Sequence, residues 1–220
     1  MYKEGRCWDN INIASYDGAG PFDIPRIRPC RSYDVEKWIG FNFAKSSRPA
    51  DRKKLGIHFW LDDYEFRRLW AQPKQYLPLL QQFGAVMSPD FSLYTDYPKA
   101  MKIWNVYRNA WLGRFWQDNG ICLVPAVSWA EEDSYSYCFD GQPVGSVVAV
   151  SSTGAMRTKT ERDLFVKGYN EMIRRLNPKE VIFSGSMPEG LLETGKIKKI
   201  GSFAEEMRER ILKKQQAVPP

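Results

Sequence analysis

Short apolar runs recur along the chain and predict buried β-strands. They begin at Gly56, Gly84, Gly120, Gly145 and Lys179. Each run is rich in apolar and β-branched residues and alternates little, which is typical of strands covered on both faces. An earlier run, residues 38–44, alternates more strongly and fits an edge strand equally well.

Amphipathic segments separate the runs and predict helices. One starts near Pro98 and ends near Gly120, and its apolar positions recur with a period of about 3.6 residues. These positions are Ala100, Trp104, Tyr107, Trp111 and Phe115, and we interpret them as a buried stripe. Thr158 and Glu161 form a capping-box pattern before a second helix. A third helical segment, residues 64–82, contains Pro73 as a break.

Alternating strands and helices predict an α/β fold of parallel βα units. We expect a single domain shaped as a small or incomplete TIM-like barrel. Residues 1–47 are expected to form an irregular N-terminal arm packed on the core, residues 48–200 the βα-repeat catalytic domain, and residues 201–220 a C-terminal helix and tail. Because βα units share one direction, the strand ends should lie together at one edge of the sheet. These ends are Asp62, Asp90, Ser128, Ser151 and Ser184.

Composition narrows the class of protein. The 220 residues are 43% hydrophobic, enough for one core, and contain no apolar run of 18 residues, so we expect no membrane partner. The first residues lack the apolar core of a signal peptide, which predicts a cytoplasmic protein. The cysteines, at positions 7, 30, 122 and 138, show no close pairing, and we expect unpaired thiols rather than disulfides.

An excess of cationic residues, 32 against 26 acidic ones, favours a polyanionic partner. The cations cluster, and phosphate contacts to a nucleic acid are the natural interpretation. The candidates for these contacts are Arg26, Arg28, Arg31, Arg52, Lys53 and Lys54. The alternative is a generic basic surface that solvates the protein.

Several chemistries have no signal in the sequence. There is no G-x-x-x-x-G-K-[ST] and no G-x-G-x-x-G after a predicted strand, so no nucleotide cofactor is expected. The cysteine spacing fits neither a zinc nor an iron–sulfur site, and no metal is expected. The one histidine, His58, lies in an apolar run, where a satisfied core histidine is the favoured interpretation over a catalytic one.

Asp90 is the leading candidate for chemistry. It follows a short apolar run that Pro89 must terminate, so its carboxylate stands at the end of a predicted strand, where parallel α/β folds bind ligands. Asp62, at the end of the preceding strand, is the second candidate. The alternative role for Asp90 is a cap of the next segment, and for Asp63 capping of the helix at Tyr64 is the favoured role.

Carboxylates ringed by aromatic residues suit cleavage of a glycosidic bond and capture of a flipped base. The residues expected to bind substrate are Trp60, Ser88, Phe91, Tyr94, Asn105, Arg108, Gln117, Ser128 and Trp129. Asn105 and Arg108 lie one helical turn apart and share a polar face. A solvated helix surface explains that pair equally well.

The motifs G-I-H-F-W-L-D-D, M-S-P-D-F-S-L-Y and V-P-A-V-S-W, in this order, resemble a domain-of-unknown-function family common in prophages and other mobile elements. In outline the chain is also similar to tRNA-guanine transglycosylase barrels, although it lacks their cysteine zinc cluster. The resemblance implies base excision from nucleic acid. The expected enzyme is a DNA glycosylase that acts on modified phage bases such as glucosylated hydroxymethylcytosine. The alternative is a non-catalytic DNA-binding replication or regulatory protein of a mobile element.

Overall fold

The computed structural model describes residues 10–202, 205–208 and 211–212. The first part of the expected N-terminal arm, with Cys7, and most of the expected C-terminal tail lie outside the described residues. Residues 205–208 and 211–212 are helical, as expected for this part of the chain. No helix in the described part is long and apolar enough to cross a membrane.

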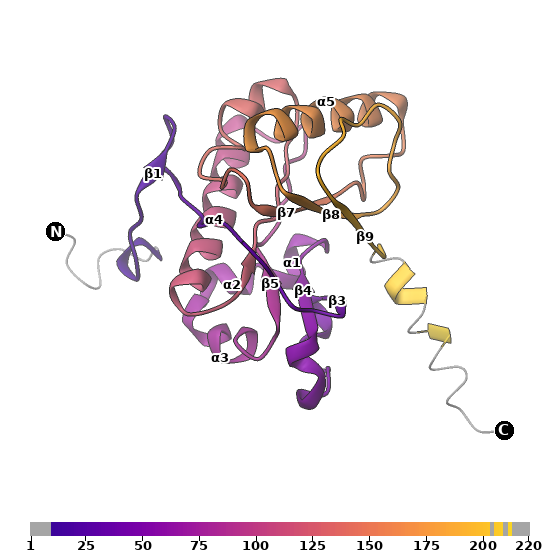
Figure 1. Ribbon diagram of the computed structural model, residues 1–220. Coiled ribbons are helices and arrows are strands. Elements are labelled where there is room, and N and C mark those ends of the chain that lie inside the picture. Colours follow the sequence, from indigo (N-terminus) through magenta and orange to yellow (C-terminus); the bar gives the residue numbers. More distant parts are fainter. Residues whose placement is uncertain (1–9, 203–204, 209–210, 213–220) are drawn as a thin grey trace.

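The core is a set of parallel strands that follow the order of the sequence (Figure 1). The first four form one sheet: β3 (Lys37–Gly40), β4 (Leu55–His58), β5 (Ala85–Met87) and β6 (Leu123–Val124). The next three form a second sheet: β7 (Val147–Ser151), β8 (Glu180–Ser184) and β9 (Ile197–Ile200). The α/β class with parallel pairing is thereby confirmed.

The two sheets are joined at their shared border. Ala126 pairs in parallel with Ala149, the Val127 N–H donates to the Ala149 carbonyl at 2.9 Å, and the Ala149 N–H donates to the Pro125 carbonyl at 2.8 Å. All seven strands therefore run in one direction, and the expected gathering of their ends at one edge is confirmed. We call this the carboxyl edge and the opposite one the amino edge.

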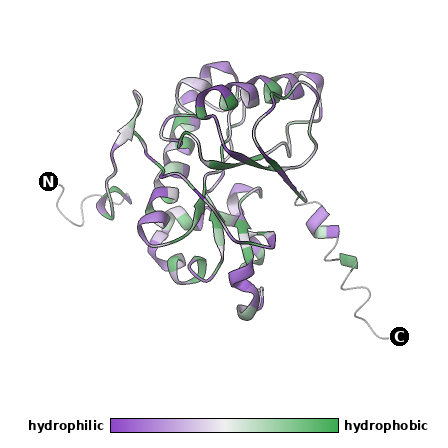
Figure 2. Cartoon of the chain, viewed as in Figure 1, coloured by the Kyte–Doolittle hydropathy of each residue, from purple (hydrophilic) through white to green (hydrophobic). Residues whose placement is uncertain are grey.

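Both faces of the strands are buried, which explains why the sequence alternates so little. One face packs against the helices through residues such as Ile57, Val86 and Phe183. The other face forms a second apolar cluster that includes Met87 and Ala149. Figure 2 shows hydrophobic colouring on the central strands β4 and β5. In the described residues β9 pairs with β8 alone, and a closed TIM-like barrel is not shown.

Two long helices cover the strands. These are α4 (Lys99–Asp118) and α5 (Lys159–Leu176). The capping box at the start of α5 is present, with Thr158 accepting from the Glu161 N–H at 3.1 Å, and Asn177 ends the helix in the left-handed region at φ 39°. The segment around Pro73 is not one helix. It consists of α1 (Asp63–Phe66), α2 (Arg68–Ala71), η4 (Pro73–Tyr76) and α3 (Leu77–Leu80).

The buried face of α4 differs from the expected aromatic stripe. Trp111 and Phe115 are buried as expected, but Trp104 is 40% exposed. The polar residues Asn105 and Asn109 are buried instead. The helix thus turns part of its polar face inward, toward the carboxyl edge, because partners from the loops there satisfy it.

The N-terminal region is more ordered than expected. It contains a two-stranded antiparallel hairpin, β1 (Gly18–Ala19) and β2 (Ile24–Pro25), before β3. Because β3 lies at one end of the parallel sheet, the expected boundary at residue 47 cuts through the sheet. Of the two interpretations left open for residues 38–44, the edge strand is confirmed over the first part of that run. Three short 3-10 helices complete this part of the chain: η1 (Asn10–Asn12), η2 (Phe41–Phe43) and η3 (Pro49–Lys54).

Candidate active site at the carboxyl edge

Asp90 lies just beyond β5 with its carboxyl group packed into the carboxyl edge. Burial raises the pKa of Asp90 to about 6, the hydrogen bond from the Ser128 hydroxyl opposes that rise, and the nearby charge of Asp63 adds to it. Ser128 follows β6, so neighbouring strands supply the acid and its hydrogen-bond donor. A carboxyl group that titrates near neutral pH can act as a general acid or a general base.

Asp63 holds the loop after β5 rather than capping its own helix. Its carboxylate accepts from the Ser92 N–H at 3.2 and 3.3 Å and from the Ser92 hydroxyl at 2.9 Å. The favoured capping role of Asp63 is therefore wrong. Asp62 occupies the N-cap position, but its side chain makes no capping hydrogen bond and the residue is exposed. The second catalytic candidate is thus at the correct edge but on the surface.

A polar relay from α4 supports the same loop. The Asn105 amide donates to the Ser92 carbonyl at 2.6 Å, and Arg108 donates to the Asn105 side-chain oxygen at 2.6 Å. The Arg108 guanidinium also lies over the Phe91 ring, 3.6 Å from its centre. Burial lowers the pKa of Arg108, and the charge of Asp63 opposes that change. Asn105 and Arg108 share a face as expected, and that face belongs to the site.

Two residues expected to touch substrate have structural contacts instead. Phe91 is fully buried, its ring centre lies 4.9 Å from that of Phe66, and its N–H donates to the Asn109 side-chain oxygen at 2.9 Å. The Ser88 hydroxyl accepts from the Ala126 N–H at 2.7 Å and ties β5 to β6. Phe91 and Ser88 therefore fix the position of the Asp90 segment and do not offer a binding surface.

The remaining aromatic candidates divide by exposure. Trp60 is buried and stacks on His58 with ring centres 5.2 Å apart. Trp129 packs against Phe165 at 5.3 Å and is half-buried. Tyr94 is 56% exposed and therefore offers most of its ring to a ligand. Of the three rings expected to clamp a base, Trp60 and Phe91 are part of the core, and only Trp129 is partly exposed.

Gln117 lies away from this site. It is twelve residues along α4 from Asn105, about 18 Å at the rise of an α-helix. Its side chain accepts from the Arg28 N–H at 2.8 Å and donates to the Arg28 carbonyl at 2.7 Å. Because α4 runs back toward the start of β6, these contacts are at the amino edge. The assignment of Gln117 to the substrate site is wrong.

The predicted phosphate-binding cations lie at the amino edge. Arg28 pairs with Asp118 at the end of α4, 2.6 Å away, and the Arg31 carbonyl accepts from Lys179, directly before β8. Lys53 and Lys54 are exposed and directly precede β4. Arg26 is also exposed and, like Arg28, lies beside the last turns of α4, where the Arg114 guanidinium donates to the Arg26 carbonyl. The sheet therefore separates these cations from Asp90.

Arg52 departs from its cluster because it is buried, with 9% exposure. Its guanidinium donates to the Gln82 side chain at 2.6 Å, to the Ser47 hydroxyl at 3.1 Å and to the Lys45 carbonyl at 3.1 Å. These bonds hold the turn before β4, so Arg52 is not a surface phosphate contact.

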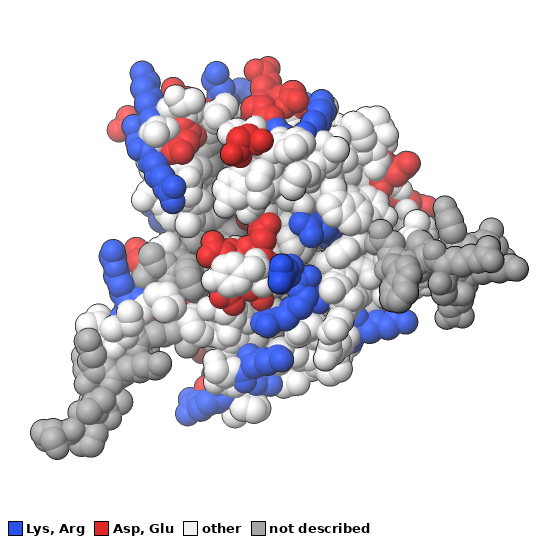
Figure 3. All heavy atoms as spheres, turned by 180° about the vertical axis from the view of Figure 1, so that it is seen from behind, with Lys and Arg blue, Asp and Glu red and all other residues white. Residues whose placement is uncertain are grey.

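Viewed from behind, the molecule carries Lys and Arg side chains in several separate groups, with acidic side chains between them (Figure 3).

An ion pair with a buried lysine, near the carboxyl edge, was not foreseen from the sequence. Lys102, on the first turns of α4, pairs with Glu131 beyond β6, and the Lys102 side chain is only 4% exposed. The Glu131 Oε2 atom is also buried and has no hydrogen-bond partner in the described part of the chain. A lysine on a predicted amphipathic helix normally faces solvent. The only signal was the position of Glu131 just after a strand end.

His58 ends β4 and is buried as expected, but its Nδ1 atom has no hydrogen-bond partner in the described part of the chain. Its Nε2 atom lies 3.6 Å from the Glu206 carboxylate, which also accepts from the Gly40 N–H at 3.1 Å. Glu206 lies beyond β9, so this contact brings the end of the described chain onto β3 and β4 at the carboxyl edge. The described residues contain no group of three or more His, Cys, Asp or Glu that could hold a metal ion.

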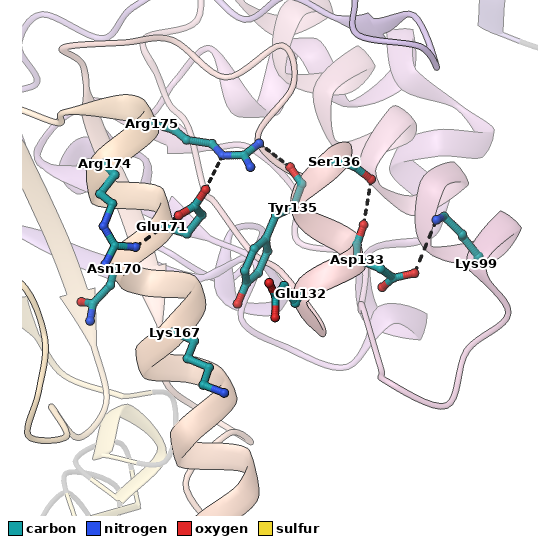
Figure 4. Close-up of a pocket in the computed structure, with 10 residues that line it drawn as sticks. All are labelled: Lys99, Glu132, Asp133, Tyr135, Ser136, Lys167, Asn170, Glu171, Arg174 and Arg175. Atoms are coloured by element: carbon teal, nitrogen blue, oxygen red, sulfur yellow. Dashed lines mark hydrogen bonds and ion pairs between the residues drawn. The ribbon is translucent and has the colours of Figure 1, made fainter.

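A groove of about 660 Å³ lies between η5 (Glu132–Ser136) and α5 (Figure 4). Much of its charge is neutralised within the protein, since Arg175 pairs with Glu171 at 2.8 Å and Lys99 with Asp133 at 3.4 Å. None of the residues predicted to bind substrate lines this groove. The candidate site is therefore defined by the Asp90 constellation and not by the groove.

Comparison with known proteins agrees with the resemblance to a domain-of-unknown-function family. The chain is 36% identical over 181 residues to "Gene 1 protein" of Mycobacterium phage L5. The aligned segment covers 82% of this chain and 79% of the relative. It is also 36% identical over 181 residues to "Gene 1 protein" of Mycobacterium phage D29, covering 82% and 67%. No solved structure matches. Residues 16–199 match the family described as "Domain of unknown function (DUF4417)", and the chain belongs to this family.

Proposed function

We propose that the protein is a nucleic-acid N-glycosylase that hydrolyses the bond between base and sugar in DNA. The observation that carries the proposal is the Asp90 carboxyl group, with a pKa raised to about 6 and a hydrogen bond from Ser128, at the carboxyl ends of parallel strands. This is the edge where α/β folds bind ligands. A carboxylate there serves the oxocarbenium-like transition state of glycosidic cleavage.

In this mechanism Asp90 acts in its ionised form. The base departs with the electron pair of the N-glycosidic bond, and the carboxylate stabilises the positive charge that develops on the sugar. Asp90 then accepts a proton from the water that adds to the sugar carbon. Asn105 and Arg108 do not react. They hold the Ser92 loop, and through it the Asp90 segment, while the exposed ring of Tyr94 stacks on the base.

We also propose that the seven strands form an incomplete barrel. Their chain order, common direction and doubly covered faces support this arrangement. The contact of Glu206 with Gly40 and His58 supports it further, because it brings the segment after the last strand onto the first two. An experimental structure in which Glu206 lies far from β3 and β4 would contradict the incomplete barrel.

The substrate that we propose is DNA with modified bases, in the cytoplasm. The resemblance to a family of mobile elements and the two phage relatives support this choice. The test is release of free base, or formation of alkali-labile abasic sites, from genomic DNA of phages with modified and unmodified bases. Asp90→Asn should lower release by about a hundredfold or more. Asp62→Asn, an exposed neighbour at the same edge, is the matched control. Loss of base release only in Asp62→Asn would show that Asp62, and not Asp90, is the catalytic carboxylate.

One observation favours a second function, a DNA-binding replication or regulatory protein without catalysis. The exposed cations Arg31, Lys53, Lys54 and Lys179 share the amino edge, away from Asp90. DNA bound there would not present a base to the carboxyl edge. A gel shift of phage DNA without base release on any substrate, in protein that is folded, would decide for this function.

A further inference from the structure

Two cysteine thiols from distant parts of the sequence meet at the amino edge. The Cys30 sulfur lies 3.5 Å and the Cys122 sulfur 3.6 Å from the carbonyl oxygen of Ser32. Both sulfur atoms thus contact the same carbonyl oxygen, which brings the two thiols close together. Neither side chain has a role in the proposed glycosylase site, which lies at the other end of the strands.

Backbone hydrogen bonds hold both cysteines in place. The Cys30 N–H donates to the Ser146 hydroxyl at 2.9 Å, and the Cys30 carbonyl accepts from the Val147 N–H at 3.0 Å. Cys122 directly precedes β6, and its carbonyl accepts from the Val86 N–H at 2.8 Å. The meeting of the thiols is therefore a property of the folded sheet and not of a loose loop.

The two thiols differ in the way that disulfide chemistry requires. Cys122 is exposed, and the hydrogen bond from Cys30 lowers its pKa to about 7, so a large share is thiolate at neutral pH. Cys30 is buried, and its hydrogen bond to Cys122 and its burial both raise its pKa. Cys122 is thus the attacking sulfur and Cys30 the sulfur that resolves.

We propose that Cys30 and Cys122 form a redox site that reacts with low-molecular-weight disulfides. The Cys122 thiolate attacks a sulfur of the disulfide, which forms a mixed disulfide and releases one thiolate. Cys30 then loses its proton and attacks the Cys122 sulfur of the mixed disulfide, which closes an intrachain bond and releases the second thiol. The small disulfide is reduced to two thiols, and the protein loses two hydrogens.

The third described cysteine provides an internal control. Cys138 is buried with 2% exposure, burial raises its pKa to about 12, and its nearest polar partner is Ser134 at 4.0 Å. It has neither thiolate character nor access to a reagent, and should remain reduced. The bond between Cys30 and Cys122 would close a long loop of chain and tie the N-terminal region to β6, which restricts the unfolded chain.

The test exposes the full-length protein to glutathione buffers that range from reduced to oxidised. We expect loss of two hydrogens by intact-mass spectrometry, a Cys30–Cys122 linked peptide after digestion, and a melting temperature raised by several degrees. Cys138→Ser should behave as the wild type. Cys30→Ser should stop at one glutathionyl group on Cys122, and Cys122→Ser should lose the linked peptide.

The outcomes separate the proposal from its alternatives. Wild-type protein that stays fully reduced in oxidised glutathione while it remains folded would overturn the proposal. Stable glutathionylation of Cys122 without closure, or dimers linked through Cys122, would also overturn it, because Cys30 would then not resolve. Acid quenching of the thiols before denaturation, followed by alkylation, shows that the bond forms in the native state.

Discussion

The two edges of the sheet differ in how their charged residues are used. At the carboxyl edge, ionisable groups are buried or held by hydrogen bonds, as in the pair Lys102–Glu131 and the Asp90–Ser128 contact. At the amino edge, Arg52 is buried but several other charged groups are exposed, as in Lys54–Glu36, where both side chains are at least 67% exposed. The difference teaches that the excess of positive charge and the unusual acid belong to separate parts of the molecule.

This separation has a physical basis. A buried charge raises the free energy of the folded state unless it is paired, so such groups persist where they position or perform chemistry. An exposed cation costs little and attracts polyanions over several ångströms. The carboxyl edge therefore fits a reaction centre, and the amino edge fits loose electrostatic contact. The following predictions test that contrast.

Asp90→Asn should have the largest effect. The substitution preserves size and leaves one acceptor oxygen for Ser128, but removes the negative charge that the sugar cation requires. Such charge stabilisation is worth about 2–4 kcal/mol of barrier, so base release should fall by about a hundredfold or more. Single-turnover release from modified phage DNA is the measurement. Nearly unchanged release with intact folding would leave Asp90 as a structural residue.

Glu131→Gln should destabilise the fold, because the buried Lys102 ammonium loses the negative charge that is its partner. The expected loss is about 3 kcal/mol in the free energy of unfolding, measured by urea denaturation. The matched change at the amino edge, Glu36→Gln, should cost less than about 1 kcal/mol, since Lys54 stays solvated. Adding Lys102→Met to Glu131→Gln should restore most of the loss. Equal losses for Glu36→Gln and Glu131→Gln would remove the contrast between the edges.

Asp90 should also shape the pH dependence of stability. Its folded pKa of about 6 exceeds the ordinary value of 3.8, so the folded state binds the proton more tightly than the unfolded chain. The stabilising contribution is full below pH 3.8 and is lost as the pH rises to about 6. Relative to the wild type, Asp90→Asn should therefore gain about 1–3 kcal/mol at pH 7.5 and little at pH 4. Urea denaturation at both pH values measures the difference, and a constant difference would place the carboxyl group in solvent.

Much of this architecture could be predicted from the sequence. The apolar runs around Ile57, Val86 and Val148 alternate little because both of their faces are buried, and this pattern indicated parallel strands with Asp90 at a shared edge. The capping box at Thr158 involves only residues close in sequence, so it was visible as well. These features depend on local pattern and on the fixed direction of βα units.

Other features depend on partners that the sequence does not reveal. Asn105 and Lys102 are buried on α4 only because Ser92 and Glu131, from different loops, satisfy them. The sequence of a helix does not show whether water or a loop supplies the hydrogen-bond partners of a polar side chain. Arg52 likewise belonged to a basic cluster in sequence, yet it turns inward to hold a turn. Sequence clusters of cations therefore indicate charge but not the edge on which it acts.

The smallest expected effect concerns the exposed cations. Lys53→Gln with Lys54→Gln should leave the melting temperature within about a degree, because neither side chain is buried and such surface changes cost little. Each phosphate contact contributes about 0.9 to the slope of log affinity against log salt, so DNA held at the amino edge, as in the second function, should lose about 1.8 of its slope. DNA bound beside Asp90 should keep its slope in this variant. Fluorescence anisotropy with a short duplex across a salt series measures it. The control is Arg157→Gln, which removes an exposed cation beyond β7 at the carboxyl edge. It should change the slope by at most about 0.9, the contribution of one phosphate contact. A slope that only Arg157→Gln changes would place the DNA at the carboxyl edge, beside Asp90, and leave the amino edge as a solvating surface.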